Sequence, residues 1–202
     1  MKSKFKTDLS NEKKLAHLLD SYYKKHLKQY HFERVFQMRK QLQGIDLVLK
    51  DKISEKQYYV DEKAQLDYIN ERLPTFAFEL FYQKNGVQKQ GWLFDATKRT
   101  DFYALVTSIF SDEANTFTTC NITFVNRNKL IQHLDRSGLN QSYLEKLIAT
   151  KKGINGKLHL DKLNEKSEGY LFFSTKNKAE KPINLVLKLD YLKNIGVAKR
   201  LV

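Results

Sequence analysis

The chain has 202 residues, of which 41% are hydrophobic, so it is long and apolar enough for one substantial core, which excludes a disordered polypeptide. Its formal net charge is +13, and no apolar run approaches the roughly 20 residues that span a bilayer, which excludes a transmembrane helix. Cys120 is the only cysteine, which excludes an internal disulfide and a cysteine-based zinc cluster. With no apolar segment behind the Lys-rich N-terminus, we expect a cytoplasmic protein and no membrane partner.

The positive charge is concentrated at the two ends of the chain. Residues 1–50 hold 12 Lys and Arg against 5 Asp and Glu, giving +7, and residues 151–202 hold the same numbers. Residues 51–150 hold 12 against 13, giving −1. This distribution suits a protein whose basic ends attract a phosphate backbone, and the alternative is an ordinary solvated surface rich in lysine.

Residues 8–29 are predicted to form an amphipathic helix, capped by Asp8 or Ser10, because Leu15, Leu19 and Tyr22 recur at helical spacing. The next segment, residues 30–43, fits either a helix or an extended strand. Gln41 lies three residues before Gly44, where it is a candidate for contact with the site or the substrate described next.

Residues 44–65 are predicted to form two antiparallel strands, 44–49 and 58–65, joined by a charged connection. Asp46 interrupts the first apolar run. In the second strand, alternation places Asp61, Lys63 and Gln65 on one face and Glu62 on the other. Carboxylates are costly to bury unless they are paired or bind a metal. An aspartate followed by Asp-x-Lys is therefore an arrangement that can bind a divalent cation beside a lysine.

This pattern, Asp46 followed by Asp61-Glu62-Lys63, resembles the motif of the PD-(D/E)xK nuclease superfamily over roughly residues 30–110, with Ile45 in place of the proline. The resemblance implies a restriction-endonuclease-like α/β fold, with a central mixed β-sheet flanked by helices. It also implies that Asp46 and Asp61 bind Mg²⁺, for which Mn²⁺ can substitute, and that Lys63 and Gln65 take part in phosphodiester hydrolysis.

Two glutamates are further candidates for the metal site. Nucleases of this class often supply an acid from the segment before the first motif strand, and Glu33 is the only acid between Asp20 and Asp46. Its alternative role is that of a surface partner for a neighbouring cation. Glu79 stands in the middle of a predicted apolar strand, residues 75–82, where it needs a lysine, a metal-bound water or solvent as its partner.

Elements predicted in the remainder are strands at 90–94, 102–110, 121–125, 157–160, 170–174 and 183–189, and helices at 127–134 and 140–150. Two loops are candidates for phosphate binding. Lys98 and Arg99 precede the strand at 102, and Lys176, Lys178 and Lys181 lie in a loop that is expected to be exposed. For Lys98 and Arg99 the alternative is a solvated turn.

We find no internal repeat and no clear linker, so a single nuclease-like domain over residues 1–202 is expected. The leading hypothesis is a metal-dependent DNA endonuclease or exonuclease. The alternatives are a non-catalytic nucleic-acid-binding protein with a degenerate nuclease core, and a structural protein in which Asp46, Asp61 and Lys63 form a buried ion-pair network. The sequence leaves open whether the chain forms a homodimer.

Overall fold

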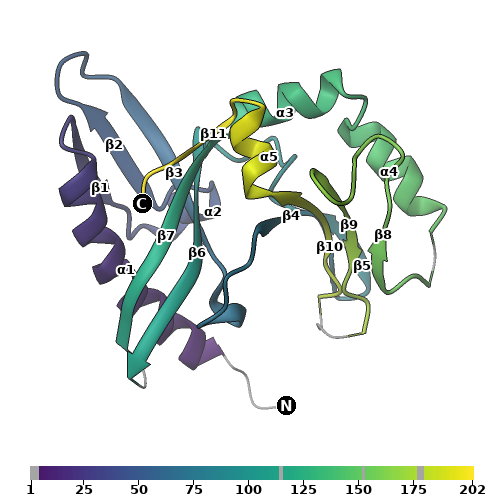
Figure 1. The fold of residues 1–202 in the computed structure, drawn as a ribbon, viewed down its shortest axis with the longest axis horizontal. Coiled ribbons are helices and arrows are strands. Elements are labelled where there is room, and N and C mark those ends of the chain that lie inside the picture. The colour runs from purple at the N-terminus through teal and green to yellow at the C-terminus, as the bar shows by residue number, and fades with distance from the viewer. Residues whose placement is uncertain (1–4, 114–115, 152, 177–179) are drawn as a thin grey trace. The chain divides into compact units, whose positions relative to one another are not determined.

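The computed structural model describes residues 5–113, 116–151, 153–176 and 180–202, with side chains described from residue 11 onward. The chain divides into two compact units, each assembled from separate stretches of sequence (Figure 1). Unit 1 comprises residues 1–73, 99–125 and 199–202, and unit 2 comprises residues 74–98 and 126–198. That the two units act together as one nuclease-like domain stays a prediction.

Unit 1 is built on a six-stranded mixed sheet with the strand order β1-β2-β3-β6-β7-β11. The strands β1 to β3 follow one another as antiparallel neighbours, whereas β3 pairs with β6 in parallel. The bounds are β1 Tyr30–Arg34, β2 Leu47–Asp51, β3 Gln57–Ala64, β6 Phe102–Glu113, β7 Thr116–Asn126 and β11 Ala198–Arg200. The unit also contains the helices α1 Phe5–His26 and α2 Met38–Leu42, and a short 3-10 turn at Leu66–Tyr68.

The long helix α1 packs against one face of this sheet. Its buried residues Leu15, Leu19 and Tyr23 follow helical spacing and form a core with Leu47 and Val60 of the hairpin. Removing a leucine side chain from such a core costs about 2–5 kcal/mol. The packing of α1 therefore fixes which face of β3 is covered, and Glu62 lies on the same face as Val60 by alternation.

Unit 2 contains a five-stranded sheet with the order β5-β4-β10-β9-β8, in which neighbouring strands are antiparallel. The bounds are β4 Thr75–Lys84, β5 Val87–Gln90, β8 Gly156–Leu158, β9 Gly169–Phe173 and β10 Ile183–Lys188. Its helices are α3 Arg127–Arg136, α4 Gln141–Ala149 and α5 Leu189–Asn194.

The α/β class is confirmed, and so are the 44–65 hairpin, the N-terminal helix and most of the strands predicted after them. The strand predicted at 90–94 is wrong, because β5 ends at Gln90 and Trp92 follows in a turn. At Gly91 the backbone passes close to β4, because a side chain there would lie 2.5 Å from the Glu79 carbonyl oxygen. Within the described residues, none of the helices is both long and apolar enough to cross a membrane.

Candidate functional site

Asp46 lies directly beside Asp61, at the point where the β2–β3 hairpin ends. The last pair of the hairpin register is Leu47 with Val60. One residue earlier, the Asp46 N–H donates to the Val60 carbonyl oxygen at 2.9 Å, and Asp46 Oδ2 accepts from the Glu62 N–H at 2.9 Å. These two bonds reach β3 on either side of Asp61, so the backbone itself holds the two aspartates together.

Asp61 is almost completely buried, with 2% of its surface exposed. Its Oδ1 forms an ion pair with the ammonium of Lys63, the residue two positions along the same strand face. Its Oδ2 is buried and, within the part of the chain that the structure describes, has no hydrogen-bond partner. A buried oxygen left without a donor costs about 1–3 kcal/mol, so this atom favours an added cation or a proton.

The pKa of Asp46 is raised from 3.8 to about 7. Burial is the largest cause and the charge of Asp61 comes next, while the charge of Lys63 and the hydrogen bond from the Glu62 N–H act in the opposite direction. When Asp46 is protonated it can donate to Asp61, and when both groups are ionised they repel each other. A divalent cation would replace that shared proton.

The donor set fits Mg²⁺ better than a metal that requires a full protein cage. Mg²⁺ prefers oxygen ligands and is commonly held by one or two carboxylates, with waters and substrate phosphates completing its octahedron. Asp46 and Asp61 supply such a pair. Over the described ranges, no cluster of three or more His, Cys, Asp or Glu side chains is suited to a metal.

The two glutamates predicted to complete the site do not form such a cluster with the aspartates. Glu33 is exposed on β1 opposite Val48, two positions from Val35, whose N–H donates to the Asp46 carbonyl oxygen. Glu79 lies in β4 of unit 2, half-buried, and pairs in register with Asn184. Metal binding by Glu33 or Glu79 stays a prediction.

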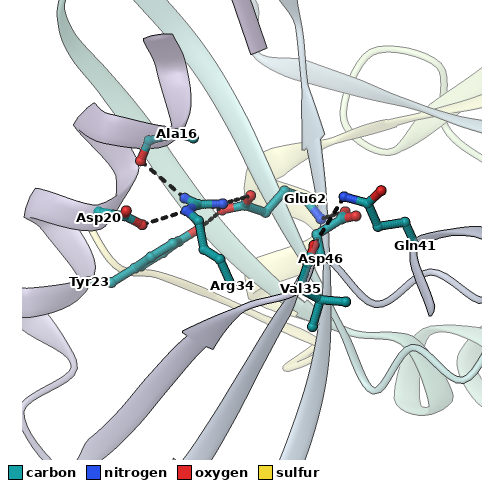
Figure 2. Close-up of polar contacts among 8 residues, drawn as sticks. All are labelled: Ala16, Asp20, Tyr23, Arg34, Val35, Gln41, Asp46 and Glu62. Atoms are coloured by element: carbon teal, nitrogen blue, oxygen red, sulfur yellow. Dashed lines mark hydrogen bonds and ion pairs between the residues drawn. The ribbon is translucent and has the colours of Figure 1, made fainter. Parts of the chain in front are cut away.

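A cavity of about 450 Å³ opens onto Asp46 and Lys63. Gln41 lines it from α2 and donates through Nε2 to the Val35 carbonyl oxygen at 3.1 Å, as Figure 2 shows. Glu12 lines the same cavity from α1 and was missed by the sequence analysis. The signal was present, because Glu12 precedes Leu15 and Leu19 by three and seven residues and so continues the inward stripe of the helix.

Glu62 alternates with Asp61 along β3, also lines this cavity, and is paired by residues of α1 and β1 (Figure 2). It accepts from the Tyr23 hydroxyl at 2.7 Å and from Arg34 Nη1 and Nη2 at 2.6 and 3.3 Å. Arg34 also donates to Asp20 at 2.7 Å and to the Ala16 carbonyl oxygen at 3.1 Å. Burial, and then the charge of Glu62, raises the pKa of Tyr23 well above its ordinary value of 10.0.

The remaining predicted residues lie at several places. Gln65 follows the last residue of β3, and its N–H donates to the Val106 carbonyl oxygen at 3.0 Å. Arg99 is exposed in unit 1, with its guanidinium 5.1 Å from the ring centre of Tyr59. In unit 2, Lys98 is half-buried near Asp95, whereas Lys176 and Lys181 are exposed. Lys178 lies outside the described residues.

No protein-family model, curated protein or solved structure matches this chain.

Proposed function

We propose that this protein is a metal-dependent DNA nuclease that hydrolyses phosphodiester bonds. The observation that supports the proposal is the arrangement of Asp46 and Asp61, two carboxylates held side by side at the end of a hairpin, with the Lys63 ammonium on one of them. A cation between the aspartates would relieve their repulsion and satisfy Asp61 Oδ2.

Each residue has a distinct role in the proposed chemistry. Asp46 and Asp61 would hold Mg²⁺ or Mn²⁺, which lowers the pKa of a bound water and stabilises charge on the phosphate. Lys63 keeps 27% of its side chain exposed while paired with Asp61, and it lines the cavity in which a phosphate would lie. There it would stabilise the negative charge that develops in the transition state. Gln65, at the end of the same strand, would position the DNA or the attacking water.

The fold of unit 1 supports membership of the PD-(D/E)xK superfamily. Asp46 directly precedes β2 and Asp61 and Lys63 lie on β3, in a run of three antiparallel strands, β1 to β3. β3 pairs in parallel with β6, and α1 covers one face of the sheet. This arrangement agrees with a restriction-endonuclease-like core. Charge supports DNA as the substrate, because the two ends of the chain each contribute +7.

The test is a cleavage assay on plasmid, linear and branched DNA with Mg²⁺, Mn²⁺ or a chelator, comparing wild type with Asp61→Asn. The matched control is Asp112→Asn, the same change at an exposed position of β6. We expect metal-dependent cleavage in wild type and in the control, and background cleavage in Asp61→Asn. A second measurement follows the melting temperature against metal concentration, since a cation that binds only the folded protein stabilises it.

Two outcomes would contradict the proposal. Binding of DNA with no cleavage under any metal would favour the non-catalytic binding protein. A melting temperature that does not change with either metal, together with reduced stability of Asp61→Asn, would leave the three residues as a structural ion-pair network.

A further inference from the structure

The segment from Phe36 to Leu42 exposes apolar side chains beside the candidate site. Phe36 is 84% exposed, and Met38 and Leu42, one turn apart on α2, are 75% and 69% exposed. None of the residues of α2 is buried, and Arg39 and Lys40 add positive charge to it. Its Gln41 nevertheless lines the cavity that contains Asp46 and Lys63. An apolar and basic segment at the entrance of a site is typical of a surface that contacts a ligand.

A second cavity, of about 790 Å³, lies between α1 and β1. Five basic side chains line it: Lys24 and Lys28 from α1, His31 and Arg34 from β1, and Lys52 from the β2–β3 turn. Lys52 is held in place by donating through Nζ to the Lys28 carbonyl oxygen at 2.6 Å. Of the described residues that line this cavity, Asp20 is the one acid, and it is engaged by Arg34 at 2.7 Å. The cavity therefore offers its lysines to an anion.

The two cavities have Arg34 and Phe36 in common. Arg34 is held by Glu62 and Asp20, so it forms a fixed part of the wall. Phe36, in contrast, projects into solvent. Phe36 therefore borders both the cavity lined by the lysines and the cavity lined by Asp46 and Lys63, and we take the route past its ring as the path between them. The first cavity is also lined by Glu12 and by Glu62, which is paired with Arg34.

We propose that this path binds a DNA strand with unpaired bases, so that the substrate is single-stranded DNA or the unpaired part of a branched or tailed DNA. Lys24, Lys28 and Lys52 contact its phosphates, a base stacks on Phe36, and the next phosphate reaches Asp46, the member of the aspartate pair that lines the first cavity. This inference rests on the proposed function and names the substrate class of the same site.

An unpaired strand explains the features better than the alternatives do. Bases in an intact duplex are stacked on one another, so their faces are closed to an aromatic side chain, whereas unpaired bases stack readily on Phe, Tyr and Trp. A second copy of this chain would cover the apolar side chains, but it would bring its own lysines against the basic cavity. Charge complementarity therefore favours a polyanion with aromatic rings.

The experiment measures binding by fluorescence anisotropy in metal-free buffer, with a labelled 20-nucleotide strand and with the duplex of the same sequence. The variants are Phe36→Ala, Phe36→Trp and the double change Lys24→Ala with Lys28→Ala. The matched control is Val87→Ala, another exposed apolar side chain, which lies on β5 in unit 2. We expect Phe36→Ala to weaken single-strand binding on the order of tenfold and to leave duplex binding unchanged. Phe36→Trp should retain affinity, and its added fluorescence should be quenched by the strand.

The double lysine variant should weaken binding and reduce its dependence on salt. Duplex binding as tight as single-strand binding, or equal affinity of Phe36→Ala and Val87→Ala, would overturn the inference. A dimer that dissociates in Phe36→Ala would overturn it too, because a second copy would then be the occupant. Phe36-dependent strand binding without cleavage under any metal would refute the nuclease alone, whereas cleavage with Phe36-independent binding would refute this inference alone.

Discussion

Asp61 and Glu62 are neighbours on β3, yet the structure treats their charges in opposite ways. Glu62 faces α1 and accepts three hydrogen bonds from Tyr23 and Arg34. Asp61 faces the other side, with one oxygen on Lys63, the other without a hydrogen-bond partner among the described residues, and the carboxyl of Asp46 beside it. Both carboxylates are shielded from most of the solvent, but only that of Glu62 is fully compensated by hydrogen bonds from the chain.

The difference separates a structural charge from a functional one. A carboxylate that is saturated by protein donors is stabilised in the folded state and has no capacity left for a ligand. A pair of carboxylates that repel each other destabilises the fold until a cation or proton arrives. Three of the four variants below change a residue on one face of β3 or a residue that contacts that face. The fourth leaves both faces unchanged.

The largest effect is expected for Lys63→Ala. Its ammonium is needed in the transition state more than in the ground state, so cleavage should fall by about 10³-fold at saturating metal. Metal should still bind, although at a higher pH, because the charge of Lys63 lowers the pKa of Asp46. Single-turnover rates and metal-dependent melting measure the two effects. Glu62→Gln, which changes the opposite face, should cost far less activity, and equal loss in the two variants would show that Glu62 takes part in the chemistry.

On the structural side, Arg34→Ala should lower the free energy of unfolding by about 3–5 kcal/mol, because it leaves Glu62 buried without its cation. Urea unfolding at neutral pH measures this. The control is Lys50→Ala, which removes an exposed ion pair with Glu55 and should cost less than about 1 kcal/mol. Similar losses in the two variants would mean that the Glu62 network contributes no more than a surface pair.

Much of the difference between Asp61 and Glu62 could be predicted from the sequence. Alternation alone placed Asp61 and Lys63 on one face and Glu62 on the other, because the period of a strand is two and the hairpin was recognisable. The partners of Glu62 could not be predicted, since Arg34 and Tyr23 lie 28 and 39 residues away and reach it only through tertiary packing. For the same reason the sequence did not indicate that Glu12 lines the cavity beside Asp46, and metal binding by Glu33 or Glu79 stays a prediction.

Short elements were also beyond prediction. The structure resolves the ambiguous residues 30–43 into both alternatives, with β1 followed by α2. Five residues have too little periodicity to distinguish a strand from a helix, and β1 forms because β2 offers it an edge. The division into two units was hidden as well, because each unit combines stretches from different parts of the chain and no linker composition separates them.

A smaller effect, and one of opposite sign, is expected for Asp46→Asn. The pKa of Asp46 is about 7 in the folded protein and ordinarily 3.8, so the folded state binds the proton more tightly. Its stability therefore falls as pH rises from about 4 to about 7. The variant removes this loss and keeps an oxygen for the Glu62 N–H, so it should be more stable than wild type at pH 8, by on the order of 2–4 kcal/mol, and equal to it at pH 4.

Urea unfolding at the two pH values measures this difference. The control is Asp51→Asn, because the N–H groups of Ser54 and Ile53 lower the pKa of Asp51. Asp51 thus adds stability at neutral pH that is lost as pH falls below its ordinary value, and its removal should destabilise the protein at pH 8. Destabilisation by Asp46→Asn at pH 8 would show that the aspartate pair is satisfied by the chain, in the same way as Glu62.

The smallest effect is expected where both faces of β3 remain intact. Lys176 and Lys181 are exposed in unit 2, so charge reversal there removes long-range attraction for phosphate without touching the aspartates. Affinity for DNA should fall severalfold at low salt and converge with that of wild type as salt screens the charges. Anisotropy titrations from low to high salt measure this, and metal-dependent melting should be unchanged. If DNA affinity changes neither with salt nor with the two charge reversals, the net charge of +13 contributes to solubility and not to DNA binding. The aspartate pair would then lack the electrostatic attraction that brings its proposed substrate to it.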